Sequence, residues 1–204
     1  MTNELSANAA DLCPVGALTH MPYTFTARPW ELKTTYSVDV SDGLGANIEL
    51  NNRATELLRI LPIVNEDVNE EWVTDKGRHM YEGLKKQRLS FPMRRKKDGT
   101  FDELRWGDAL KETGKILTQA KGDEIVGIIG PHADAESIVA FRDLLHKLGS
   151  ERIHHTQTSA KVGVNLRSEY LWNSKIVGLD HTDYILIVGA NLRTEAPILN
   201  SRIM

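Results

Sequence analysis

The sequence predicts an α/β protein in three regions: a tail over residues 1–35, a small β-rich module over 36–89, and part of a doubly wound α/β domain over 90–204. Two observations predict this class. Apolar and polar residues alternate with period two in the middle region, whereas strand, helix, strand and turn follow one another in the last. The chain has 204 residues and is 41% hydrophobic, which is enough to bury a core in one or two domains.

The first region is rich in proline, threonine and aromatic residues. Pro14, Pro22 and Pro29 all fall within it. Because proline lacks a backbone N–H and disrupts helix interiors, we expect turns and extended chain here rather than a long helix.

The middle region has the pattern of a hairpin followed by a third strand. Val38–Val40 and Ile48–Leu50 alternate apolar and polar residues, and Gly43 and Gly45 lie between them. A further short strand is predicted over Leu57–Leu61. We therefore expect a small β-rich module.

The last region has alternating helix and strand patterns. Apolar residues in Trp106–Ala120 fall on one helix face, and Ile125–Ile129 is typical of a buried strand. Asp134 is positioned to cap a second helix that Gly149 ends, and Tyr184–Val188 predicts a second buried strand.

The α/β region contains few elements for a complete domain. Pro197 favours a final helix, which would have only the residues up to Met204 to run. We expect that the α/β unit is truncated or that another chain completes it.

Charge and composition argue against several classes. The formal net charge is −3, so no overall basic excess points to nucleic acid. No apolar run approaches the ~18 residues of a membrane span, so any membrane association would come through partners. Residues 1–11 hold two acids and no Lys or Arg, which fits neither a secretory signal nor a transit peptide. Either the chain is made where it works or a targeting segment has been removed.

Cys13 is the single cysteine of the chain. One cysteine excludes an internal disulfide and a self-contained multi-cysteine metal site. Pro14 follows it, and Gly16 and Ala17 would let the backbone approach a cluster closely, as in ferredoxin-type sites. On these residues alone, a buried small hydrophobe is the more common role for such a cysteine.

A family resemblance adds to this local pattern. Cys13 lies in a stretch, residues 11–19, that resembles the segment of the large iron–sulfur subunit of respiratory complex I that supplies a last cluster ligand. The resemblance continues in order through residues 22–31, 59–62, 66–72, 83–89, 167–171 and 195–197, and covers essentially the whole chain.

The resemblance implies that Cys13 is the distant fourth ligand of a 4Fe-4S cluster. The other three cysteines would lie on a separate chain, the N-terminal half of a split or truncated subunit, so the cluster would be shared. The implied function is an electron relay from NADH and flavin to ubiquinone, with no catalytic site within this chain. The alternative is a structural scaffold of the peripheral arm with no cluster of its own.

The resemblance also implies a location and partners. The flavoprotein and other peripheral-arm subunits would be neighbours, on the matrix side of the mitochondrial inner membrane or on the cytoplasmic side in a bacterium. Neither nucleic acid nor a direct membrane span is expected.

The middle and last regions resemble molybdopterin oxidoreductases, which often hold a further 4Fe-4S cluster. An approximate alignment places Val38, Ser41, Gly45 and Thr74 where those relatives have cysteines. Hydroxyl and aliphatic side chains cannot replace thiolates on iron. We therefore expect no second cluster and no molybdopterin, and we interpret the turn at Gly189 as retained scaffold.

Three other features have competing interpretations. The basic strip Lys76–Lys97 is more typical of a solvated or subunit-facing surface than of an RNA site. The pair His154 and His155 would point to opposite faces of a strand and is not expected to bind metal. Arg28 either stabilises a reduced cluster or pairs with an acid while Trp30 fills core, and these alternatives stay open.

Overall fold

The computed structural model describes residues 3–156, 163 and 165–204. The chain forms two compact units: residues 1–88 with 163–204, and residues 89–162. The described residues contain both helices and strands, which confirms a mixed α/β class.

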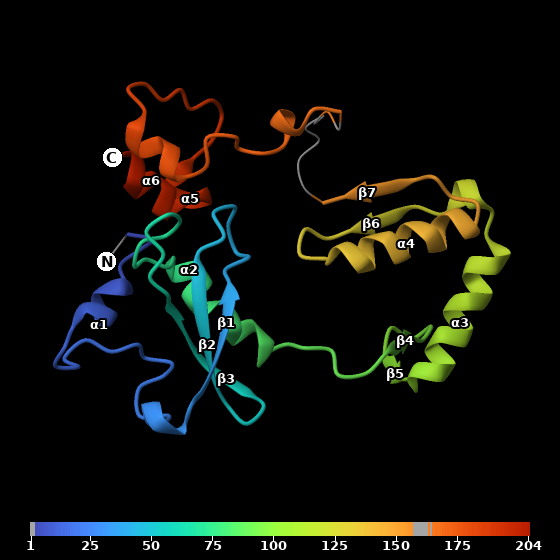
Figure 1. Cartoon of the computed structure of the whole chain (residues 1–204). Coiled ribbons are helices and arrows are strands. Elements are labelled where there is room, and N and C mark those ends of the chain that lie inside the picture. The colour runs from blue at the N-terminus through green and yellow to red at the C-terminus, as the bar shows by residue number, and fades with distance from the viewer. Residues whose placement is uncertain (1–2, 157–162, 164) are drawn as a thin grey trace. The chain divides into compact units, whose positions relative to one another are not determined.

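A three-stranded antiparallel sheet forms the centre of the first unit, in the order β1-β2-β3 (Figure 1). The strands are β1 (Lys33–Val38), β2 (Asn47–Arg53) and β3 (Glu56–Pro62). The predicted hairpin and third strand are therefore confirmed. β1 begins earlier than the alternation indicated and ends at Val38, and both Val38 and Val40 are exposed.

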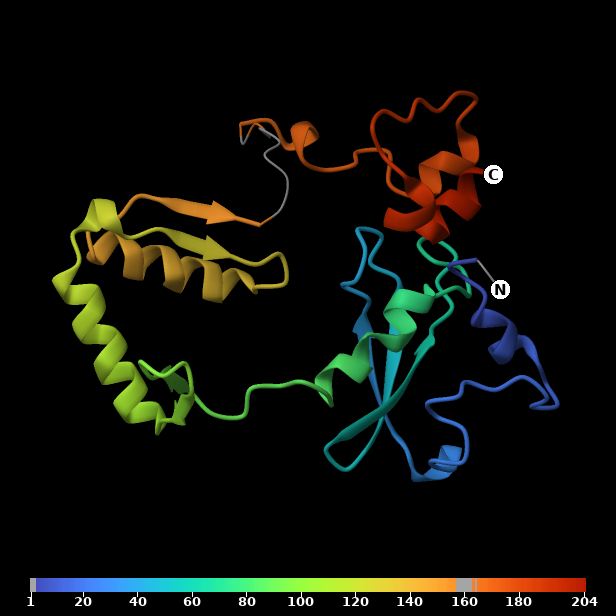
Figure 2. The same cartoon turned by 180° about the vertical axis from the view of Figure 1, so that it is seen from behind.

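One face of this sheet is covered by a short helical segment. α2 (Asp75–His79) contacts β3 and continues into the 3-10 helix η2 (Met80–Leu84) (Figure 2). Ile48, Ile60, Val73 and Tyr81 form the buried core between them. Thr74 starts α2 by accepting the Gly77 N–H at 3.0 Å, which satisfies a donor that the helix cannot pair itself.

The tail is joined to this core. It contains α1 (Asn8–Leu12) and the 3-10 helix η1 (Pro29–Glu31), separated by turns. The prediction of turns and extended chain without a long helix is confirmed. Asn8 is buried, and its side chain bonds the backbone of Val73 in both directions, at 2.8 and 3.2 Å.

The C-terminal segment of the first unit is built from short helices. They are η4 (Arg167–Glu169), η5 (Val177–His181), α5 (Leu192–Glu195) and α6 (Pro197–Ile203). Pro197 occupies the first turn of α6, as predicted. Arg202 on α6 pairs with Asp180 at 3.1 Å and donates to the Val68 carbonyl at 3.2 Å.

The predicted strand over Tyr184–Val188 is wrong. No strand is assigned to these residues, and Tyr184, Leu186 and Val188 are each more than 70% exposed. Their sequence is that of a strand buried between neighbours, but a strand exists only where another strand pairs with its backbone.

The second unit contains one β–α–β crossover. β6 (Gly127–Ile129) pairs in parallel with β7 (Ile153–His155), and α4 (Ala135–Lys147) lies along them in both views (Figures 1 and 2). A Cβ at Gly127 would overlap Leu145 and Phe141, so glycine permits this close packing. A strand and a helix that starts after Asp134 are confirmed, but β6 is shorter than predicted and Ile128 is 64% exposed rather than buried. Asp134 occupies the N-cap position without a side-chain cap bond, and the partner of β6 is β7.

The remaining elements of the second unit precede β6. β4 (Met93–Arg95) and β5 (Phe101–Glu103) form a hairpin that was not predicted, and α3 (Trp106–Gln119) follows as predicted. The 3-10 helix η3 (Gly122–Glu124) leads into β6. Among the described residues the two-stranded parallel sheet is the full extent of the predicted doubly wound domain.

None of the described helices has both the length and the hydropathy that a membrane span requires.

Candidate metal-ligand site at Cys13

Cys13 ends α1 and begins a tight loop. Its backbone is extended, and the Gly16 N–H bonds the Cys13 carbonyl at 3.3 Å to close a turn. Gly16 adopts a φ of 66°, a left-handed conformation that glycine takes without strain. We call residues 12–19 the Cys13 loop. It places the thiol at a partly exposed position.

The backbone of the Cys13 loop stabilises a thiolate. The N–H of Leu18, followed by those of Ala17, Val15 and Gly16, lowers the pKa of Cys13 below its ordinary value, against a smaller opposing effect of burial. The thiolate is the form that ligates iron, and N–H groups directed at sulfur also tune cluster potentials. The loop thus has the chemistry of a ligand-presenting segment.

The two ends of the Cys13 loop meet at one buried arginine. Arg78, on α2, is 2% exposed; its Nη2 lies 2.5 Å from Asp11 Oδ2 and 2.9 Å from Asn8 Oδ1. Its Nη1 lies 3.4 Å from His20 Nε2, and that nitrogen is 3.2 Å from Asp11 Oδ1. We call Asn8, Asp11, His20 and Arg78 the Arg78 cluster.

Electrostatics within the Arg78 cluster favour an ionised Asp11. Burial raises the pKa of Asp11, but the hydrogen bond from His20 and the charge of Arg78 outweigh it and lower the pKa below its ordinary value. Sequence reasoning missed this cluster, because Arg78 is 67 positions from Asp11 and is one of nine basic residues in the Lys76–Lys97 strip.

Several large apolar side chains of the tail face solvent. Val15, Met21, Phe25 and Trp30 are each more than 80% exposed. The alternative in which Trp30 fills core is therefore wrong.

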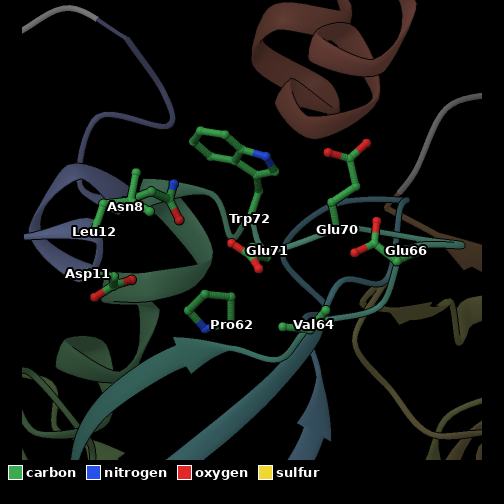
Figure 3. Close-up of a pocket in the computed structure, with 9 residues that line it drawn as sticks. All are labelled: Asn8, Asp11, Leu12, Pro62, Val64, Glu66, Glu70, Glu71 and Trp72. Carbon is green, nitrogen blue, oxygen red and sulfur yellow. The ribbon is translucent and has the colours of Figure 1, made fainter.

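A pocket of about 360 Å³ lies beside α1 and is lined by both acidic and apolar side chains (Figure 3). Asp11 and Leu12 border it from α1, Pro62 and Val64 from the end of β3, and an acidic loop closes it, with Glu66, Glu70, Glu71 and Trp72. Such a pocket repels anions. Across residues 3–156, 163 and 165–204, no group of three His, Cys, Asp or Glu side chains is arranged to hold a metal.

The four positions aligned with a second cluster lie at or near the β1–β2 loop and the start of α2. The Lys76 ammonium reaches the Ser41 carbonyl at 2.8 Å, and Thr74 caps α2. Ser41 donates its N–H to the buried Asp39 carboxylate at 2.8 Å. The side chains there are oxygen donors or aliphatic groups and do not fit an iron–sulfur cluster.

Arg28, the histidine pair and the basic strip are the other candidates that the sequence offers. Arg28 donates its backbone N–H to Glu31 at 3.1 Å, while Arg53, not Arg28, pairs with Glu31 among the described residues. His154 and His155 are neighbours on β7. In the basic strip, Lys85, Arg94 and Lys96 form ion pairs with acids at 2.7, 2.8 and 3.0 Å. These pairs favour a structural interpretation of the strip.

Comparison with known protein families defines the class. Residues 32–82 match the 4Fe-4S domain model of NADH-ubiquinone oxidoreductase NDSU1/NuoG-like proteins, and residues 88–204 match the molybdopterin oxidoreductase model. The two matches define an oxidoreductase type in which an iron–sulfur domain precedes a molybdopterin-type domain. This chain belongs to the molybdopterin oxidoreductase family.

Individual relatives are more specific. The chain is 48% identical, over its full length, to NADH dehydrogenase (ubiquinone) iron-sulfur protein 1, mitochondrial, of Solanum tuberosum and to the mitochondrial 78 kDa subunit of NADH-ubiquinone oxidoreductase of Neurospora crassa. It is 44% identical over 98% of its length to the 75 kDa subunit of Reclinomonas americana. The predicted family resemblance is confirmed. The chain spans 28%, 28% and 31% of these relatives.

The matched 4Fe-4S segment and the cysteine lie in different parts of the chain. The matched 4Fe-4S segment, residues 32–82, contains no cysteine, and Cys13 precedes it. Any thiolate ligand that this chain contributes must therefore come from the tail.

Proposed function

We propose that this chain is part of NADH–ubiquinone oxidoreductase, respiratory complex I, and that Cys13 supplies the fourth ligand of a 4Fe-4S cluster. The cluster would belong to the relay that carries electrons from NADH and flavin to ubiquinone. One observation carries the proposal: the sole thiol of the chain lies in a loop whose N–H groups stabilise a thiolate. The relatives, named as NADH-ubiquinone oxidoreductase subunits, support it.

The residues of this chain hold the ligand and control its surroundings. When bound, a 4Fe-4S cluster supplies one-electron transfer. Cys13 contributes the thiolate, and the N–H groups of the Cys13 loop offset negative charge on the sulfur. Val15 and its exposed apolar neighbours would exclude water once a partner covers them. In this role the chain itself would form and break no covalent bond of a substrate.

The partners follow from the single ligand. Three further ligands must come from outside the described residues, and we propose a separate N-terminal chain of the same subunit that shares the cluster. Exposed apolar residues of the tail, among them Val15 in the Cys13 loop, would contribute to the surface that this partner covers. The flavoprotein and other peripheral-arm subunits would be its further neighbours, on the matrix side of the mitochondrial inner membrane. The cytoplasmic side of a bacterial membrane is the alternative.

The proposal assigns one cluster and no molybdopterin to the chain. Ser41 and Thr74 stand at the positions aligned with a second cluster, and they offer hydroxyls rather than thiolates. Iron from more than one cluster in contact with this chain would contradict this part.

The test replaces the ligand in the assembled complex. Cys13→Ala should remove or convert one four-iron signal in low-temperature EPR, lower the iron content and impair electron flow from NADH to quinone. Thr19→Ala is the control, because it alters the same loop but keeps the thiol, and it should retain every signal. An unchanged set of signals in Cys13→Ala would favour the second candidate, a scaffold subunit without a cluster.

A further inference from the structure

We propose that Arg78 is a positioning residue that holds both ends of the Cys13 loop together and so keeps Cys13 in its ligand geometry. The role in cluster binding rests on the proposed function, whereas the effect on the loop itself does not.

The geometry links the two ends through one guanidinium. Asp11 precedes the Cys13 loop and His20 follows it, and Arg78 contacts both, at 2.5 and 3.4 Å. Asp11 and His20 also contact each other at 3.2 Å. The loop is therefore closed at its base by three side chains, although it has few contacts with the rest of the chain at its tip, where Val15 is 83% exposed.

Arg78 is itself fixed. It is 2% exposed, and α2 is held by the Thr74 cap and by close packing of Gly77 on the Asp39 carboxylate, where a Cβ would overlap. A rigid support matters because the position of a ligand is only as exact as the residues behind it. The Ile60 carbonyl, 3.5 Å from Nη1, adds a weaker contact to the sheet.

The chemistry requires arginine rather than any cation. A guanidinium presents five N–H donors in a planar fork and bonds several acceptors at once, whereas an ammonium acts as a point charge. At this site the fork donates to Asp11 and Asn8 together, while its Nη1 lies 3.4 Å from the His20 ring. Lysine would keep the charge and lose the connection between the loop ends.

The first readout needs no cluster. Because Cys13 is the only cysteine, the rate at which the full chain is alkylated by iodoacetamide at neutral pH reports this thiol alone. Arg78→Gln should free the loop and slow alkylation about threefold, because the thiol would no longer be held at the partly exposed position that the closed loop gives it. Arg78→Lys should recover only part of the rate.

A matched control separates this effect from general damage. Arg202 is another nearly buried arginine, its side chain 8% exposed, and it pairs with Asp180 away from the loop. Arg202→Gln should leave the alkylation rate unchanged. If Arg78→Gln keeps a native circular dichroism spectrum and is alkylated at the wild-type rate, the proposal is overturned. If Arg78→Gln does not fold, His20→Ala decides, because it releases one end only and must also slow alkylation.

The second readout is made in the assembled complex. Arg78→Gln should shift the midpoint potential or the EPR line shape of one four-iron cluster, and Arg202→Gln should not. If Cys13→Ala changes no signal while Arg78→Gln slows alkylation, the proposed function fails and the loop proposal stands. If Cys13→Ala removes a signal that Arg78→Gln leaves unaltered, with alkylation unchanged, the loop proposal fails alone.

Discussion

At the residue scale, the buried carboxylates of the β1–β2 loop are the least well paired groups of the first unit. Asp39 Oδ2 and Asp42 Oδ2 are buried without a hydrogen-bond partner in the part of the chain that the structure describes. Burial, followed by the nearby charge of Asp39, raises the pKa of Asp42 above its ordinary value, although the N–H of Leu44 opposes this. A carboxylate with a raised pKa favours the protonated form in the folded state.

The raised pKa of Asp42 determines how its contribution to stability changes with pH. Because the folded-state pKa of Asp42 lies above its unfolded value, its contribution to stability is present below the unfolded pKa and is lost as pH rises through the folded pKa. We predict that Asp42→Asn stabilises the chain by about 0.5 kcal/mol at pH 7, a figure reduced for the partial exposure of the side chain. Urea unfolding at pH 7 and at pH 3 checks this.

The gain from Asp42→Asn should disappear at pH 3, where Asp42 is protonated. Asp11→Asn is the opposite control, since the pKa of Asp11 is lowered and its stabilisation is present at pH 7. Equal effects of the two substitutions at pH 7 would show that the raised pKa of Asp42 has no bearing on stability.

At the scale of the element, α2 is the part of the first unit that supports both the core and the Cys13 loop. Gly77 lies against Asp39, which is 1% exposed and cannot move aside. We predict that Gly77→Ala destabilises the chain by about 1–2 kcal/mol despite the better helix propensity of alanine, because a Cβ overlaps the carboxylate.

Gly83→Ala supplies the control for this prediction. A Cβ at Gly83 meets nothing within 4 Å, and its φ is not positive. The change should be neutral or stabilising by about 0.5 kcal/mol, as for a compatible glycine. Thermal melts of the two variants compare them directly, and equal midpoints would contradict close packing at Gly77.

The elements also show what a sequence can predict. Alternation located β2 and β3, and helical periodicity located α3 and α4, because each pattern is local. Tyr184–Val188 failed since pairing of a parallel strand depends on neighbours that local sequence does not specify. The β4–β5 hairpin was missed, although its Asp98-Gly99 turn is a recognised hairpin signal.

The same division holds for the site. Pro14 and Gly16 beside Cys13 are compatible with a cluster ligand, but only the family resemblance favoured that role over a buried small hydrophobe. Arg78 could not be identified from the sequence, since its partners Asp11 and His20 lie 67 and 58 positions away and meet it only after α1 and α2 have packed. Local sequence presents Arg78 as another member of a basic strip, whereas burial gives it a specific role.

At the scale of the whole molecule, the division into two units has a consequence for proteolysis. The first unit's continuous part ends at Arg88, and Lys85, Lys86 and Arg88 are exposed there. We predict that limited proteolysis with trypsin cuts the chain first within Lys85–Arg88. Mass spectrometry of the early fragments identifies the position of the cut. Arg78, which is 2% exposed, should be cut much later. Early cleavage after Arg78 would contradict the packing of α2.

The exposed apolar side chains of the tail affect the stability of the chain in the cell before a partner binds it. Val15, Met21, Phe25 and Trp30 remain in water although the fold beneath them is complete. Surfaces of this kind are what chaperones hold and quality-control proteases recognise. If the proposed partner covers these residues, we predict that a cell that makes the chain in excess degrades the surplus, so that the supply of the partner sets the steady-state amount of the chain.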